Sequence, residues 1–214
     1  MGQRIGKPTR ADAIYDALRR DILTGVYGPG TRLPFHELSA RYGAGTGVLR
    51  EVFPRLAEQG LVESGPQPGF RVVVLSDDRV RQLTEARVLL ESICLADAIK
   101  CGSLSWESEV LSAHHTLSRT PVSHPGGAIN LDWVDAHARF HRVLLSGAEN
   151  TVLRELAESL RAIAEVGRTW TKPWSDSRRR DTAGEHRRIS AAALARDTAT
   201  AVTELSAHLR DGGR

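Results

Sequence analysis

The sequence has only two cysteines and no long hydrophobic run. These absences argue against a disulfide-stabilised protein and against a membrane-spanning one. No run of about 18 apolar residues occurs, so we expect no membrane-spanning helix. The basic start, MGQRIGKPTR, has no apolar stretch behind it and does not match a secretory signal. The two cysteines, Cys94 and Cys101, lie about 10 Å apart along one helical pattern, too far for a disulfide. A reducing, cytoplasmic location fits these features.

Excess positive charge is confined to the first third of the chain. Residues 1–75 hold 10 Lys and Arg against 7 Asp and Glu, a net charge of +3, whereas residues 76–214 hold 19 of each kind. A basic module of this type is typical of contact with a polyanion. Because the remainder is neutral, we expect it to form a second module with a different task. The predicted domains are therefore 1–75 and 76–214.

The apolar periodicity of the first 75 residues predicts three helices followed by a β-hairpin. The pattern ADAIYDALRRDILTGVY places Ile14, Leu18 and Ile22 on one face and ends at Gly25. Two shorter helical patterns, FHELSARY and TGVLREVFPRLAEQ, lie on either side of a glycine turn. Two apolar runs, LVE and FRVVVL, then flank a Gly/Pro turn as strands. This is the order of elements in a winged helix-turn-helix.

From Ser76 onward, every periodic segment is helical. Ser76 and the two aspartates after it have the residue types of an N-cap and an acidic first turn. The fold class we predict is therefore mostly α, with a winged helix-turn-helix domain followed by an all-helical bundle. The expected bundle helices are 76–101, 104–118, 130–147, 150–170, 175–195 and 197–210.

A helix-turn-helix binds duplex DNA by laying its second helix in the major groove, where residues near the helix start reach base edges. Loops and the wing hold phosphates. Arg50 stands beside the helix start, which favours contact with DNA. For Arg41 and Arg55, a solvated surface position is about as well supported as contact. The candidate DNA-contacting residues are His36, Thr46, Gly47, Arg50, Arg55, Gln67, Gly69 and Arg71.

Two histidines four residues apart lie on the apolar face of the pattern LDWVDAHARFHRVLL. His137 and His141 can therefore turn their rings toward one ion. His186 and His208 also lie on apolar faces of their predicted helices. Four inward-facing histidines would be costly to bury without partners, and a shared metal ion would remove that cost. Four separately satisfied core histidines are the alternative.

The first 75 residues resemble a known family of DNA-binding domains. DALRRDILTGVYGPGTRL, HELSARYGAGTGVLREVFPRLAEQGLVE and GFRVVVL are similar to the N-terminal domain of GntR-type bacterial transcription regulators. Family members often carry Ser-Arg at the start of the recognition helix and further arginines in the helix before it and in the wing. In this sequence, the recognition helix starts with Gly45 and Thr46, the helix before it carries His36, and the wing reads SGPQPG. The resemblance implies binding to double-stranded DNA, with an unusual operator or weaker affinity.

The rest of the chain resembles the all-helical FCD effector domain of the FadR branch of that family. The matching segments are QLTEARVLLESICLADAI, HARFHRVLLSGAEN, EHRRISAAALARD and AVTELSAHL. In many members this domain binds a small organic acid and a divalent metal, which an acid and three histidines hold. The resemblance places the three histidines at His141, His186 and His208, and the acid's position at His137. It therefore implies a four-histidine site that favours borderline metals, zinc or nickel above all, over manganese.

Arg87 is the candidate effector-binding residue. In TEARVLLES, the resemblance places an arginine here that faces the ligand pocket, where its guanidinium would bind a carboxylate through two hydrogen bonds. An i,i+4 pair with Glu91 on the surface is an equally supported alternative. Asn150 matches a Gly-x-x-Asn of the family, and we expect it to cap the helix that follows.

Together these features predict a metabolite-responsive, DNA-binding transcription regulator rather than an enzyme. The resemblance implies a homodimeric repressor on a palindromic operator, with a small carboxylate as effector. A metal-dependent enzyme is one alternative, because multi-histidine sites can activate water. No acid stands at the spacing of a helical His-Glu motif, however, and Glu185 should point to another side than His186. A metal-binding sensor whose winged helix contacts protein is the other alternative.

Overall fold

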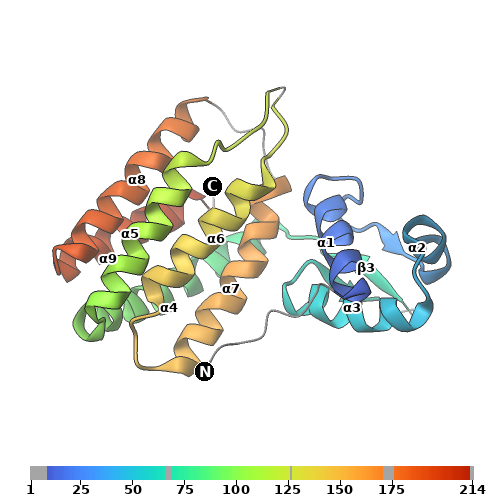
Figure 1. The fold of residues 1–214 in the computed structure, drawn as a ribbon, viewed down its shortest axis with the longest axis horizontal. Helices are drawn as coiled ribbons and strands as arrows, with labels where there is room; N and C mark the ends of the chain where they lie inside the picture. The colour runs from blue at the N-terminus through green and yellow to red at the C-terminus, as the bar shows by residue number, and fades with distance from the viewer. Residues whose placement is uncertain (1–8, 66–68, 126, 171–175, 213–214) are drawn as a thin grey trace. The chain divides into compact units, whose positions relative to one another are not determined.

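The computed structural model describes residues 9–65, 69–125, 127–170 and 176–212, and most of them are helical (Figure 1). The chain divides into two compact units, Met1–Leu75 and Ser76–Arg214. The first unit combines helices with a small sheet, and the described part of the second is built from helices packed on one another. The predicted fold class is confirmed.

The first unit has the elements of a winged helix-turn-helix. Its sheet has the strand order β1-β3-β2, with both pairs antiparallel. Strand β1 was not predicted, because two residues are too few to show an alternating pattern. It pairs Leu33 with Phe70 and so adds a third strand to the expected hairpin. The elements are α1 (Arg10–Leu23), β1 (Arg32–Leu33), α2 (Phe35–Tyr42), α3 (Thr46–Glu58), β2 (Val62–Ser64) and β3 (Phe70–Val72).

Stacked aromatic rings connect the helices of this unit to its sheet. Phe53 of α3 is fully buried, and its ring lies 5.1 Å from that of Phe35 and 4.4 Å from that of Phe70 between centroids. Leu18 and Ile22 of α1 are also fully buried, as their helical spacing predicts. The rings tie α2, α3 and β3 together, so α3 is held firmly against the wing. Such packing fixes the exposed face that α3 presents to a partner.

The second unit consists of long helices whose apolar faces meet in one core. Helix α4 packs against α7 and α9, α5 against α6 and α8, and α8 against α9. All six predicted helices are present with ends close to those expected. They are α4 (Asp77–Cys101), α5 (Leu104–Arg119), α6 (Leu131–Leu145), α7 (Thr151–Trp170), α8 (Asp176–Leu194) and α9 (Thr198–Gly212).

Two of the helix starts carry the caps that the sequence predicts. The Ser76 hydroxyl accepts a hydrogen bond from the backbone N–H of Arg79 at 3.2 Å. The Asn150 side-chain oxygen accepts one from the backbone N–H of Leu153 at 3.0 Å. Each bond satisfies a donor that the first turn of a helix leaves without an intrahelical acceptor.

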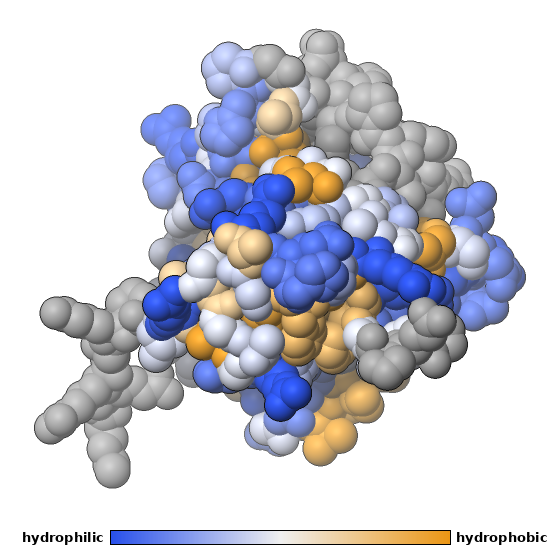
Figure 2. Space-filling model, turned by 90° about the vertical axis from the view of Figure 1, so that its right-hand side faces the viewer, coloured by the Kyte–Doolittle hydropathy of each residue, from blue (hydrophilic) through white to orange (hydrophobic). Residues whose placement is uncertain are grey.

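The surface mixes polar and apolar residues. Figure 2 shows one face, on which hydrophilic and hydrophobic side chains are intermingled. Across the described ranges, we find no helix with both the length and the apolar character that a membrane span requires. Both cysteines are free thiols, Cys94 buried and Cys101 exposed.

Candidate metal centre and nucleic-acid interface

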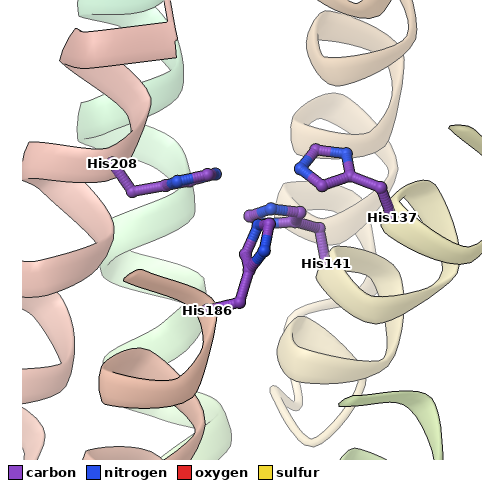
Figure 3. A group of neighbouring side chains, drawn as sticks. All are labelled: His137, His141, His186 and His208. Carbon is purple, nitrogen blue, oxygen red and sulfur yellow. The ribbon is translucent and has the colours of Figure 1, made fainter. Parts of the chain in front are cut away.

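Four buried histidines from three helices meet in the core of the second unit. His137 and His141 come from successive turns of α6, His186 comes from α8 and His208 from α9 (Figure 3). Their exposed fractions are 4%, 1%, 2% and 8%. One ring nitrogen of each lies within 4.8 Å of the corresponding nitrogens of the others. The structure thus brings together all four residues that the sequence singles out.

Aromatic neighbours hold these rings in place. Trp133, one turn before His137 on α6, stacks on it with 4.9 Å between ring centroids. Phe140 packs edge-on against His141 and His186, at 5.4 and 5.3 Å. The sides of the cluster that face Trp133 and Phe140 are therefore apolar.

The electrostatics of the cluster suit metal ligation. Burial lowers the pKa of His141 well below its usual value, and the neighbouring histidines and the charge of Arg87 lower it further. His141 is therefore neutral at physiological pH, which is the form that binds a metal. Within the described part of the chain, neither ring nitrogen of His141 has a hydrogen-bond partner. Buried polar atoms in native proteins are rarely left in this state, and a metal ion is one of the accepted explanations.

Two carboxylates that sequence reasoning missed lie on the outer side of the cluster. Glu185 Oε2 is 2.8 Å from Nδ1 of His208, and Glu165 Oε2 is 3.6 Å from Nδ1 of His137. We expected Glu185 to point away from the metal histidines, and this was wrong: its carboxylate contacts His208, a member of the cluster, because α8 packs against α9. No local spacing indicates either contact, because each joins residues of different helices. A metal-bound histidine usually donates its outer N–H to such an acceptor.

Arg87 forms the predicted i,i+4 pair with Glu91, but the pair is buried. The Nε–H of Arg87 donates to Glu91 Oε1 at 2.7 Å, and the two side chains are 12% and 0% exposed. The expectation of a surface pair was wrong in this respect, because α4 packs against both α7 and α9. Since the charge of Arg87 acts on His141, its guanidinium lies within electrostatic reach of the histidine cluster.

The candidate DNA contacts at the start of α3 are accessible. Thr46, Gly47 and Arg50 are exposed there, and His36 of α2 is exposed as well. No ion pair joins Arg50 to another residue that the structure describes. His36 lies 3.6 Å from its neighbour Glu37. These positions leave the first turns of α3 free to meet a partner.

The remaining candidates are held within the winged unit or lie elsewhere. Arg55 pairs with Asp12 of α1 at 3.0 Å, and Arg71 pairs with Glu63 of the neighbouring strand at 2.7 Å. Gly69 is exposed in the wing, with a φ of +139° that favours glycine. Gln67 lies outside the described residues. Arg55 and Arg71 would have to share or exchange these carboxylates to reach phosphates.

Arg41 follows the same pattern. It pairs with Asp21 at 2.9 Å, and its guanidinium lies over the ring of Tyr27. These contacts give Arg41 a structural role in joining α2 to α1.

Two family matches together span most of the chain. Residues 10–72 match the family described as bacterial regulatory proteins, gntR family. Residues 82–211 match the FCD domain. The two matches fall on the winged unit and on the helical unit respectively.

Individual proteins show the same likeness. The HTH-type transcriptional repressor GlaR of Escherichia coli is 31% identical over 91% of this chain and 90% of its own length. The solved structure of E. coli McbR/YncC covers 95% of this chain and 94% of its own, with a TM-score of 0.72 at 17% identity. The Zn2+-bound FCD domain of TM0439 covers 65% of this chain and 92% of its own, with a TM-score of 0.50 at 18% identity.

Proposed function

The chain belongs to the gntR family of bacterial regulatory proteins and carries an FCD domain, and we propose that a small carboxylate bound beside its four-histidine centre switches it. That the chain is a DNA-binding transcription regulator follows from the family and from the repressors it resembles. The same membership indicates a regulator rather than an enzyme. We propose in addition which kind of molecule the regulator senses and which residues bind it.

The convergence of His137, His141, His186 and His208 is the observation that carries the proposal. Buried imidazoles within reach of one ion are suitable ligands for zinc or nickel. The lack of any hydrogen bond to His141 within the described residues argues against four separately satisfied histidines. An FCD domain of similar fold has been solved with Zn2+ bound. The bound metal would act as a Lewis acid that attracts a carboxylate oxygen.

Arg87 would supply the second contact to the effector. Glu91 engages its Nε–H, and no other hydrogen bond joins its guanidinium to a described residue. The terminal N–H groups are therefore available for a carboxylate. Glu91 also restrains the guanidinium, so less side-chain entropy would be lost when an effector binds.

For DNA, we propose that Arg50 and the first turn of α3 read base edges in the major groove. A homodimer would place two such helices on the two halves of a palindromic operator. We place the protein in the cytoplasm, with the DNA that it reads. The effector can change affinity for the operator only if it binds one arrangement of the dimer better than another.

Fluorescence anisotropy with DNA from upstream of the coding sequence tests this proposal. We expect tighter binding to one duplex than to a random duplex at moderate salt, and weaker binding by Arg50→Ala. The matched control is Arg210→Ala, an exposed arginine of α9. Equal affinity for specific and random duplexes would favour a winged helix that contacts protein. Arg50→Ala with unchanged affinity would remove Arg50 from the interface.

A further inference from the structure

We propose that Glu165 acts through His137 as a positioning residue for the metal. In this assignment, the carboxylate of Glu165 lies behind the imidazole of His137 and supplies negative charge that the four histidines lack. The inference rests on the proposed metal centre. It assigns a task to Glu165 of α7, a helix that contributes none of the four histidines.

The charges at the centre show why such a residue is needed. Four neutral imidazoles bring no negative charge to a buried divalent cation, and uncompensated buried charge is costly. Glu165 and Glu185 bring two negative charges, both set behind the histidines. The charge of a divalent ion and the charges of these two carboxylates sum to zero. Carboxylates behind the ligands thus supply the negative charge that the ligands themselves lack.

The contacts of His137 show how Glu165 could also orient the ring. Trp133 stacks on the face of His137 with an interplanar angle of 21°, while Glu165 Oε2 lies 3.6 Å from Nδ1 at its edge. With its proton on Nδ1 and facing the carboxylate, the imidazole has its lone pair on Nε2, at the other side of the ring. The stack with Trp133 restrains the face of the ring, and a hydrogen bond to Glu165 in the metal-bound protein would restrain its edge.

The two outer carboxylates differ in a way that separates their tasks. Glu185 Oε2 lies 2.8 Å from Nδ1 of His208, which is a hydrogen bond. Glu165 lies 3.6 Å from His137, beyond the range of a hydrogen bond. Replacing Glu185 should therefore weaken both the fold and the centre. Replacing Glu165 should lower metal affinity through His137.

The test compares zinc affinity and stability in the metal-free, full-length protein. Competition with a chromophoric chelator gives the affinity for Zn2+, and thermal unfolding gives Tm without metal. For Glu165→Gln we expect the affinity for Zn2+ to fall by about 10- to 100-fold. Glu155→Gln, at an exposed glutamate of the same helix, is the control and should match the unchanged protein.

A second pair of variants excludes a merely structural effect. In a His137→Asp background, Glu165 has no imidazole to orient, so Glu165→Gln should then change zinc affinity by less than about threefold. An equal loss in both backgrounds, or wild-type affinity in Glu165→Gln, would overturn the assignment of Glu165 and leave the metal centre intact. If the unchanged protein binds no zinc, the centre and this assignment both fail.

Discussion

His208 and Glu185, on the neighbouring helices α9 and α8, are joined by a 2.8 Å hydrogen bond between the ring Nδ1 and the carboxylate. With its proton on Nδ1, the ring has its lone pair on Nε2. The contact therefore links helix packing to the chemical state of a proposed ligand.

Metal content should depend on His141, the most buried of the four histidines. His141→Ala removes one ligand and leaves three, so we expect the zinc content to fall well below one equivalent. Elemental analysis of protein purified without chelator or nickel resin measures this. His115→Ala, at an exposed histidine of α5, is the control. A full equivalent retained by His141→Ala would contradict the proposed ligand set.

Effector binding should require the metal. Without it, the centre is flanked by the charges of Glu165 and Glu185, and the charge of Arg87 is already paired with Glu91. Such a site repels carboxylates. With zinc bound, a matching small carboxylate at about 100 times its Kd should stabilise the protein by about 2.7 kcal/mol, raising Tm by several degrees. Thermal-shift screening with and without zinc measures the difference, and equal shifts in both series would refute the requirement.

The pair of Arg87 and Glu91 should be strongly coupled in stability. Arg87→Met leaves the fully buried Glu91 without its partner, which should cost about 3–5 kcal/mol of unfolding free energy. The double variant Arg87→Met/Glu91→Leu removes both charges and should lose less than Arg87→Met alone. Denaturant unfolding of both variants and of Glu91→Leu completes the cycle. Additive losses would show that the two charges do not stabilise each other.

Acid should weaken the packing of α6 on α7 through Glu158. Burial alone would raise the pKa of Glu158, but the hydrogen bond from Arg142 and the charge of Arg161 outweigh it, so the pKa is lowered. A carboxyl group whose pKa is lower in the folded state stabilises the fold above its unfolded pKa. That contribution is lost as the pH falls through the folded pKa.

Glu158→Gln tests this linkage. We expect the variant to be less stable than the unchanged protein at pH 7, and the difference to shrink as the pH is lowered below about 4. Thermal unfolding measured across this range gives the comparison. A difference in Tm that stays constant with pH would show that the contribution of Glu158 is not electrostatic.

The pairing of His137 with His141 was predictable because helical periodicity decides which residues of one helix share a face, whereas the addition of His186 and His208 rested on the resemblance to the FCD domain. His137 and His141 lie one turn apart, and an i,i+4 spacing places them together whatever surrounds the helix. The predicted caps at Ser76 and Asn150 are equally local, since each joins residues three apart. Such features depend on the backbone of a single helix, and so the order of residues determines them.

Only the tertiary structure could decide which helices meet. The contacts of Glu165 with His137 and of Glu185 with His208 cross between helices, so their distances depend on packing that no local pattern contains. The burial of Arg87 has the same origin, because α4 is covered on two sides. The order of residues by itself therefore determined which side chains share a helix face and which cap a helix. The packing of the helices decided which carboxylates stand behind the histidines and which charges are buried.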